Sequence, residues 1–456
     1  MKVLLTGSTG LIGREIGKRL VARGDQVVTL VRDLDRARRT EPFPAERYLW
    51  NHVDEVPAEA LLGVDAVIHL AGEPIADGRW TAERKQKIRD SRIVSSRRLV
   101  QAVLKHGSSV EAFVQGSAIG IYGDRGDEVL NAASTGGSGF LPEVVRDWEA
   151  EIKALSPTVR SVVIRTGVVL ARHGGALEKM LSLFRLGLGA RLGFAGSQWM
   201  SWIHLEDIVS LFLYALDQRH VSGVLEGVSP EPLRNRDFTS RLTRGLGVIE
   251  SPPVPQLTLK LLYGEMASII LESARVEPKS TQAAGFQFQF ASAEAAFRDL
   301  LEPLRGQTCE VLAEQWVPQT PQTIWPYFCD EKNLEELTPS NLKFRVVGKS
   351  TPEISEGTLI DYRLSLSGVP FGWRTKIESW QPPSRFIDNQ IQGPYAYWHH
   401  THEFIPMGGG TLMRDRVYYR LPLGWLGTVA AGWKVASDVA AIFAYRRLKV
   451  DQLFHV

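Results

Sequence analysis

The stretch TGSTGLIG, residues 6–13, directly follows the apolar run KVLL at residues 2–5. An apolar strand that enters a glycine-rich turn and then a helix is the arrangement that binds the pyrophosphate of a dinucleotide. In such a turn Gly7 permits the tight bend, Gly10 lets the backbone approach the phosphates, and Gly13 lets the helix pack close to the strand. The pattern therefore predicts a phosphate-binding loop. The alternative is a glycine-rich turn that holds no ligand.

The segments after this turn complete a unit of strand, turn, helix and strand. Residues 14–23 carry Ile16 and Leu20 at a spacing typical of one helix face, and Gly24 ends that helix. Residues 26–31, QVVTLV, form a second strand. A unit of this kind predicts an α/β fold with a doubly wound parallel sheet of the Rossmann type.

The end of the second strand indicates which dinucleotide is preferred. Folds that prefer NAD usually carry an acidic residue there to bind the ribose hydroxyls, whereas this chain has Val31. Arg32 follows, and a guanidinium can stack on adenine while it pairs with a 2′-phosphate. The sequence thus predicts NADP (NADPH) as the cofactor. Arg36, Arg38 and Arg39 are interpreted as a solvated helix face.

Two further segments are predicted to be strands that end beside the cofactor. Residues 64–72, VDAVIHLAG, end in small residues that suit a backbone passing under a ligand, and His69 is expected to form local hydrogen bonds. Residues 113–117, FVQGS, end in Ser117, which places a hydroxyl where parallel sheets carry their chemistry.

The composition argues against several classes of protein. The chain has 456 residues with 53 basic and 51 acidic side chains, a balance that favours neither nucleic acid nor a membrane surface as a partner. Only Cys309 and Cys329 are present, so a disulfide framework is not expected and a reducing compartment is favoured. The start of the chain runs directly into a strand, and the longest apolar run, LGWLGTVAAGW, is shorter than the roughly 20 residues of a membrane helix. We therefore expect a cytoplasmic protein without a membrane segment.

The order of motifs over residues 1–300 resembles a known family. The glycine-rich turn is followed by HLAG, GSAIGIYGD, RTGVVL and WIHLEDIV, as in extended short-chain dehydrogenase/reductases, the class of sugar-nucleotide epimerases and dehydratases. The segments AGEPIADGRWTAERKQKIRDSR, FRLGLG and KSTQAAGFQF are similar to the subfamily called "epimerase family protein" or, in older labels, "cell division inhibitor". This resemblance implies an NADP(H)-binding Rossmann fold with a small substrate lobe near residues 170–300. It implies no particular substrate.

The resemblance also indicates which residues contact the cofactor. Arg92 in DSR resembles a family position near the phosphates, and Val169 in RTGVVL is expected beside the nicotinamide. The predicted cofactor-binding residues are Gly7, Thr9, Gly10, Leu11, Ile12, Gly13, Arg32, Leu70, Ala71, Gly72, Arg92 and Val169.

The usual catalytic pair of the class is absent. Its dehydrogenases use a Tyr and a Lys four residues apart on one helix, where the Lys lowers the pKa of the Tyr for proton transfer. The matching segment, residues 139–152, has Leu141 and Val145 at the two places, although the upstream serine is matched by Ser117. The nearest replacement acid is Tyr122, for which packing is the alternative role. Ser117 and Tyr122 are therefore the predicted catalytic residues.

A change of composition at residues 305–307 predicts a second domain, so that the first spans residues 1–304 and the second residues 305–456. Its segments alternate apolar and polar residues between glycine and proline turns, which predicts an antiparallel sheet. A long amphipathic helix ending near residue 454 is predicted from Leu426, Val429, Trp433, Ala436, Val439 and Phe443.

This order of elements, with QTIWPYF, HHTHEF, GTLMRDRVYY and FAYRRL, resembles the START-like, polyketide cyclase or SRPBCC superfamily. The resemblance implies an α+β helix-grip domain with a cavity for an apolar ligand, and it names no ligand. The candidate tryptophans for lining that pocket are Trp373, Trp380, Trp398, Trp425 and Trp433. Core packing alone accounts for most of them.

Three histidines of the segment YWHHTHEFIP raise the question of a metal. On a strand, His400 and His402 share one face and His399 points to the other, so at most two ligands converge without help. Sheet pairing or polar roles in the cavity account for them, and we predict no metal. Asp415 and Arg416 are interpreted as cross-strand partners.

Three functional hypotheses follow. The first is an NADP-dependent oxidoreductase or epimerase that acts on a small carbonyl or sugar-nucleotide-like substrate. The second is a non-enzymatic NADPH-binding sensor or regulator, which the missing catalytic pair would explain. In the third, the C-terminal half captures an apolar or carbonyl-bearing ligand and presents it to the nicotinamide.

Overall fold

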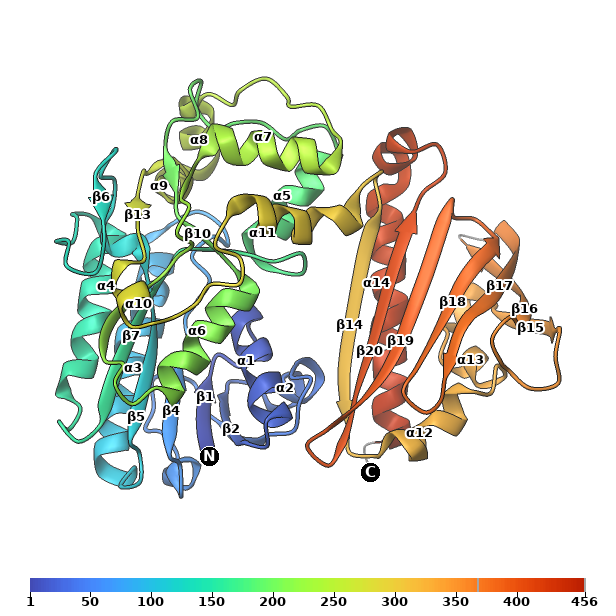
Figure 1. Ribbon diagram of the computed structural model, residues 1–456, viewed down its shortest axis with the longest axis horizontal. Helices are drawn as coiled ribbons and strands as arrows, with labels where there is room; N and C mark the ends of the chain where they lie inside the picture. Colours follow the sequence, from blue (N-terminus) through green and yellow to red (C-terminus); the bar gives the residue numbers. More distant parts are fainter. Residues whose placement is uncertain (367–368, 455–456) are drawn as a thin grey trace. The chain divides into compact units, whose positions relative to one another are not determined.

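The structure of the protein is a computed structural model that describes residues 1–366 and 369–454 (Figure 1). The chain divides into two compact units, one formed by Met1–Arg38 and Ala45–Glu302 and the other by Arg39–Pro44 and Pro303–Val456. Each unit has hydrophobic clusters of its own.

The first unit is built, within the described residues, on a seven-stranded sheet whose neighbouring strands are all parallel. The strand order is β11-β7-β5-β4-β1-β2-β3. Its strands are β1 (Lys2–Thr6), β2 (Gln26–Val31), β3 (Glu46–Leu49), β4 (Ala66–His69), β5 (Ala112–Ala118), β7 (Arg160–Thr166) and β11 (Gly223–Gly227). The order reverses direction between β1 and β4, and a ligand of a doubly wound sheet binds outside the strand ends at such a point. The predicted parallel Rossmann-type sheet is confirmed.

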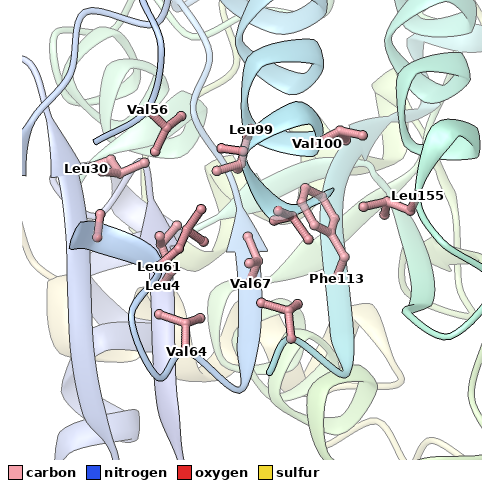
Figure 2. Packing of buried hydrophobic residues seen from close by; sticks show 14 of the residues in the cluster. Leu4, Leu30, Val56, Leu61, Val64, Val67, Leu99, Val100, Phe113 and Leu155 are labelled. Atoms are coloured by element: carbon pink, nitrogen blue, oxygen red, sulfur yellow. The ribbon is translucent and has the colours of Figure 1, made fainter. Parts of the chain in front are cut away.

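Helices cover both faces of this sheet, with α3 and α4 on one side and α1 and α6 on the other (Figure 1). The sheet-covering helices are α1 (Leu11–Ala22), α3 (Ala82–His106), α4 (Phe140–Glu151) and α6 (Leu205–Asp217). On one face, Leu99 of α3 packs in a buried cluster with Leu4, Val67 and Phe113 of three neighbouring strands (Figure 2). Because both faces are covered, inner strands such as β1, β2 and β4 are mostly apolar and buried runs.

The remaining elements of the first unit are short strands and helices outside the seven-stranded sheet. Its strands are β6 (Val129–Leu130), β8 (Val168–Leu170), β9 (Trp199–Met200), β10 (Trp202–His204), β12 (Leu233–Arg234) and β13 (Arg275–Val276). The remaining helices of the unit are α2 (Leu34–Thr40), α5 (Gly175–Arg185), α7 (Asn235–Leu246), α8 (Gln256–Tyr263), α9 (Ser268–Leu271), α10 (Lys279–Ala283) and α11 (Ala293–Leu301).

The second unit is a sheet whose paired strands are all antiparallel, in the order β14-β20-β19-β18-β17-β16-β15. Its strands are β14 (Cys309–Val317), β15 (Arg345–Lys349), β16 (Leu359–Leu366), β17 (Val369–Gln381), β18 (Arg385–Gln392), β19 (Tyr397–Met407) and β20 (Gly410–Arg420). Its helices are α12 (Pro321–Phe328), α13 (Asn333–Glu336) and the long α14 (Trp425–Phe454). The predicted antiparallel sheet followed by a long terminal helix is confirmed.

The burial of α14 differs from the expectation of one continuous apolar face. Val439 and Phe443 are buried against the sheet, whereas Leu426, Val429 and Trp433 are 55%, 45% and 73% exposed. The sheet of the second unit covers apolar residues only in the later turns of α14. The regular apolar spacing over the whole helix therefore predicts a longer buried face than the structure has.

The same helix corrects the expectation that no segment is long and apolar enough to cross a membrane. Of the helices in the described chain, α14 alone meets the length and hydropathy required of a membrane span, and 11% of its most apolar window is buried. A single such helix is weak evidence for a span, because the core helix of a protein outside the membrane meets the same criteria.

Candidate cofactor site and substrate cavity

The glycine-rich turn lies where the strand order of the first sheet reverses. β1 and β4 are parallel neighbours with Thr6 opposite His69, so Gly7 and Leu70 leave the sheet side by side. Gly7 has φ +71°, and a Cβ added to it would lie 2.8 Å from the carbonyl carbon of Leu70. A Cβ on Gly13 would lie 2.2 Å from the carbonyl oxygen of Gly7. Only glycine fits at both positions, because real Cβ atoms do not approach so closely.

The first turn of α1 faces the loop without a side-chain cap. Gly10 is the N-cap residue, no side chain accepts a hydrogen bond there, and the first turn of this described helix holds no acidic residue. The amide groups at the start of a helix carry a partial positive charge and lack partners inside the helix. Thr9, Leu11 and Ile12 lie at this end, which therefore suits a phosphate group.

Thr6 and His69 fix the backbone that follows β4. The hydroxyl of Thr6 accepts hydrogen bonds from the amides of Leu70 and Ala71, both at 3.1 Å, and is 2.7 Å from His69 Nδ1. His69 Nε2 is 3.0 Å from the hydroxyl of Ser96. Complete burial lowers the pKa of His69 to about 3, so the ring is neutral. The expected local role of His69 is thus confirmed, and it holds the strand end in place.

Arg92 presents a guanidinium against the backbone of Gly72. A Cβ on Gly72 would lie 3.3 Å from Cζ of Arg92, and the guanidinium is also 5.5 Å from the ring of Trp148. Burial lowers the pKa of Arg92 to about 10, which leaves the group cationic at neutral pH. The structure therefore brings a partly buried positive charge beside Gly72, one of the predicted cofactor-binding residues.

Arg32 lies just past β2, where its side chain is 59% exposed and forms a 3.4 Å ion pair with Glu73. Glu73 also pairs with Arg84 at 2.8 Å, so Arg32 is held weakly and is accessible to an anion. Nearby, burial lowers the pKa of His52 to about 4, with a further contribution from the charge of Arg32. Within the described chain, the buried Nδ1 of His52 has no hydrogen-bond partner. Sequence reasoning missed His52 because it belongs to no motif.

The segment that follows Val169 approaches the start of α1 through the tertiary fold. Val169 lies in β8, which pairs in parallel with β10. The chain then passes through Gly174 and Gly175, where an added Cβ would lie 3.2 Å from side-chain atoms of Leu11 in either case. Residues separated by more than 150 positions in the sequence thus meet at the start of α1.

The predicted catalytic residues are joined in a buried polar network. Ser117 donates a 2.6 Å hydrogen bond to Glu149, and Arg165 binds both oxygens of the same carboxylate at 2.9 and 2.8 Å. Arg165 also donates to the hydroxyl of Tyr122 at 3.0 Å, and that hydroxyl donates to the carbonyl oxygen of Asn131 at 2.9 Å. Tyr122 is fully buried, and burial raises its pKa. This geometry favours the packing role of Tyr122 over the catalytic one.

Apolar side chains occupy the helix positions where the class carries its Tyr and Lys. Val145 of α4 is buried in a cluster with Ile121 and Tyr122, and Leu141 packs near Gly120. Neither side chain can transfer a proton or lower a tyrosine pKa, so any acid must come from elsewhere.

A cavity of about 620 Å³ adjoins Leu141. Its polar lining includes Asp124, Lys260 and Glu272, with Trp80 and Phe140 among the aromatic residues. Burial raises the pKa of Glu272, and the nearby charge of Asp124 adds to this. Lys260 and Glu272 were missed because the sequence around them shows only a helical pattern and no catalytic motif. A carboxyl group with a raised pKa in a cavity is a candidate general acid.

A second cavity, of about 200 Å³, lies in the second unit and is lined mainly by aromatic and aliphatic side chains. Trp373, Trp380 and Trp398 line it as expected. The expectation for Trp425 and Trp433 is wrong, because their side chains are 62% and 73% exposed on α14. The polar end of this cavity contains Asp388, His400, His402 and Arg446.

A parallel sheet with a glycine-rich turn at its switch point defines the class of dinucleotide-binding α/β proteins. Comparison with known proteins makes this assignment specific. The NAD dependent epimerase/dehydratase family matches residues 3–225, and a domain of unknown function, DUF1731, matches residues 254–300.

The chain matches most of the length of relatives from distant organisms. Epimerase family protein SDR39U1 homolog, chloroplastic, of Arabidopsis thaliana is 35% identical over 313 residues, which are 66% of this chain and 87% of that protein. Epimerase family protein ML0860 of Mycobacterium leprae is 37% identical over 289 residues, which are 63% of this chain and 91% of that protein. The chain therefore belongs to the NAD dependent epimerase/dehydratase family, among the epimerase family proteins similar to SDR39U1.

A solved structure bears on the cofactor. The crystal structure of human epimerase family protein SDR39U1 (isoform2) with NADPH is 32% identical in sequence, with a TM-score of 0.60. The similarity covers 66% of this chain and 99% of the human chain. The predicted cofactor is thus confirmed for a member of the same family.

Proposed function

We propose that the first unit binds NADPH and acts as an oxidoreductase or epimerase on a small carbonyl or sugar-nucleotide-like substrate. The glycine-rich turn carries this proposal, because its close approaches at Gly7 and Gly13 leave an uncapped helix end open to a pyrophosphate. The NADPH-bound human relative supports the choice of cofactor. Arg32, which is exposed and weakly paired, would hold the 2′-phosphate, and Arg92 would lie near the pyrophosphate.

The cavity beside Leu141 is the proposed substrate site. NADPH, when bound, supplies a hydride for a carbonyl carbon. Glu272, whose pKa is raised, gives a proton to the carbonyl oxygen, and Lys260 balances the charge of an anionic substrate group. Ser117 keeps Glu149 and Arg165 in register and does not donate the proton itself, because its own proton is committed to Glu149.

The alternative is an NADPH-binding sensor or regulator without turnover. Leu141 and Val145 favour it, because the two positions that normally hold the proton-transfer pair are apolar. The hydroxyl of Tyr122 favours the sensor as well, because it is already hydrogen-bonded to Asn131 and Arg165.

For the second unit we propose a START-like domain that binds an apolar ligand in its cavity and supplies a carbonyl-bearing ligand to the first. The aromatic lining of the cavity supports an apolar ligand. We also propose a cytoplasmic location and no nucleic-acid or membrane partner, from the balanced charge.

Calorimetric titration of the purified 456-residue chain with NADPH and NADH tests the cofactor. We expect Arg32→Glu to weaken NADPH binding by about tenfold or more while NADH binding changes little, since one charge-assisted contact contributes about 1.5–3 kcal/mol. Arg38→Glu is the matched control, because Arg38 is also exposed but forms only a 3.9 Å pair within its own helix. Equal NADPH affinity in Arg32→Glu and the wild type would contradict the assignment.

A panel of carbonyl compounds with NADPH then separates the enzyme from the sensor. The enzyme oxidises NADPH with at least one compound, and Glu272→Gln lowers kcat by about 100-fold or more, as expected when a general acid is removed. NADPH binding without turnover across the panel would favour the sensor.

A further inference from the structure

The second unit buries a cluster of charged and titratable side chains that the proposed chemistry of the first unit does not use. Asp388 lies on β18, His400 and His402 on β19, and Asp415 on β20. The register sets Asp388 opposite His400 and His402 opposite Asp415. The cluster forms one end of the cavity, and Arg446 of α14 borders it.

Asp415 faces one edge of both histidine rings. Its Oδ1 is 3.1 Å from His400 Nε2 and 2.7 Å from His402 Nδ1. Arg446 Nη2 lies 3.6 Å from the same oxygen, an ion pair of the kind that an ionised carboxylate forms. The carboxylate is therefore an acceptor, and an unprotonated ring nitrogen 2.7 Å from it would be repelled. His400 Nε2 thus donates a hydrogen bond to Asp415, and His402 Nδ1 lies in close contact with the same oxygen.

Arg446 offers a weaker alternative on the same edge. Its Nη2 is 3.4 Å from His402 Nδ1 and 3.6 Å from Asp415 Oδ1. Donation from Arg446 to His402 Nδ1 would leave that nitrogen without a proton beside Asp415. A proton on His402 Nδ1 would point to the carboxylate instead, so the tautomer of His402 sets which of the two is its partner.

The opposite edge of the rings faces Asp388. Its Oδ1 is 3.0 Å from His402 Nε2 and 3.6 Å from His400 Nδ1. A neutral ring that donates one N–H keeps a lone pair on its other nitrogen. In one tautomer His402 Nε2 donates a hydrogen bond to Asp388. With the proton of His402 on Nδ1 instead, two nitrogen lone pairs and a carboxylate oxygen converge here. A second proton on His402 would let its Nε2 donate to Asp388. His400 Nδ1, which is 3.6 Å from Asp388 Oδ1, would still have no hydrogen bond.

We infer that Asp388, His400 and His402 bind a divalent cation of the zinc type, with Asp415 as the carboxylate that orients both histidines. The three ligand atoms all lie within 4.8 Å of one another. Ligands about 2.1 Å from a tetrahedral zinc lie roughly 3.4 Å apart, so the contacts of 3.0 and 3.6 Å fit closely. A histidine ligand that donates its other N–H to a carboxylate is the usual outer-sphere arrangement of such sites.

A cation would also change the charge of the cluster. Asp415 is a buried carboxylate, Asp388 is a partly buried one, and Arg446 lies 3.6 Å from Asp415. With neutral histidines one negative charge is left over, which is costly in an apolar cavity. A divalent cation turns it into one positive charge, which an anionic oxygen of a bound ligand would neutralise. Three protein ligands leave a fourth position toward the cavity, where an oxygen atom of an otherwise apolar ligand would bind.

Single-strand geometry had argued against a metal, because His400 and His402 alone provide two ligands. The sheet supplies the third from β18 and the orienting carboxylate from β20. His399, on the other strand face, contacts Glu378 at 3.8 Å instead and takes no part in the cluster.

The test uses the 456-residue chain, free of any affinity tag and stripped of metal with a chelator. Co²⁺ is added while absorption between about 500 and 650 nm is recorded, and Zn²⁺ binding is measured by calorimetry. We expect one equivalent of either ion per chain. Asp388→Asn and His402→Gln should abolish the Co²⁺ absorption, and Asp415→Asn should weaken Zn²⁺ binding by about 10- to 100-fold.

His399→Gln is the matched control, because it removes a neighbouring histidine from the opposite face and should leave binding unchanged. Circular dichroism shows whether each variant is folded. The titration of the wild type does not depend on whether a variant folds. The absence of a Co²⁺ band at millimolar Co²⁺ in the wild type would overturn the inference. Equal binding by Asp388→Asn and the wild type would overturn it as well, as would loss of binding in His399→Gln.

Discussion

The hydroxyl of Ser117 lies 2.6 Å from Oε1 of Glu149, to which it donates a hydrogen bond. Glu149 in turn forms an ion pair with Arg165 whose two side chains are only 12% and 8% exposed. The carboxyl end of β5, where the class places its catalytic serine, is therefore occupied by a closed and fully paired network. This network stabilises the fold whether or not the protein turns over a substrate.

Glu149→Gln should lower the free energy of unfolding by about 3–5 kcal/mol, because it leaves the buried guanidinium of Arg165 without its counter-charge. Urea denaturation at pH 7 measures the effect. Glu151→Gln, two residues further along α4, is the control. Glu151 pairs with Arg97, which is 53% exposed, so its replacement should cost about 1 kcal/mol or less. Similar losses for both variants would contradict the buried role of Glu149.

Tyr122→Phe should lower stability by about 1 kcal/mol, since it removes a hydroxyl that bonds Asn131 and Arg165. Because that hydroxyl is buried and has both partners, NADPH oxidation in any active assay should stay within about threefold of the wild type. The check is the same carbonyl panel with both proteins. A loss of about 100-fold in kcat with unchanged stability would instead identify Tyr122 as the acid.

Gly13→Ala should abolish NADPH binding and lower stability by about 1–3 kcal/mol. The new methyl group would lie 2.2 Å from the carbonyl oxygen of Gly7, so α1 must move away from the turn. Thermal denaturation and NADPH titration report the two effects. In Gly120→Ala the added Cβ would make an ordinary 3.7 Å contact with Leu141, and this variant should retain both stability and binding.

Glu272→Gln should change the pH dependence of stability. The pKa of Glu272 is raised in the folded state by burial and by Asp124, so the folded chain binds its proton more tightly than the unfolded chain does. Stability contributed by this group is therefore present at low pH and is lost as the pH rises above the ordinary value of 4.5. Denaturation curves between pH 4.5 and 8 should show the variant gaining stability relative to the wild type as the pH rises. A difference that is independent of pH would contradict the raised pKa.

The local sequence was sufficient to predict the elements that depend on neighbouring residues along the chain. The glycines of the turn and the apolar strands of the first sheet follow from backbone sterics and hydrophobic spacing, and these predict β1, α1 and β2 to within a few residues. The hairpins of the second sheet follow for the same reason. The helical spacing of α14 predicted its length but not its burial, because a regular pattern does not show which turns another element covers.

The sequence alone determined the nucleotide-binding turn, the parallel and antiparallel sheets and the missing catalytic pair, since each depends on residue type at fixed local spacing. Only the tertiary structure decided that Ser117 is bound to Glu149 and Arg165, that Glu272 lines a cavity next to Leu141, and that Asp388 and Asp415 flank His400 and His402. Those partners come from separate strands and helices. Their distances are set by the packing and register of whole sheets, which no single stretch of the chain contains.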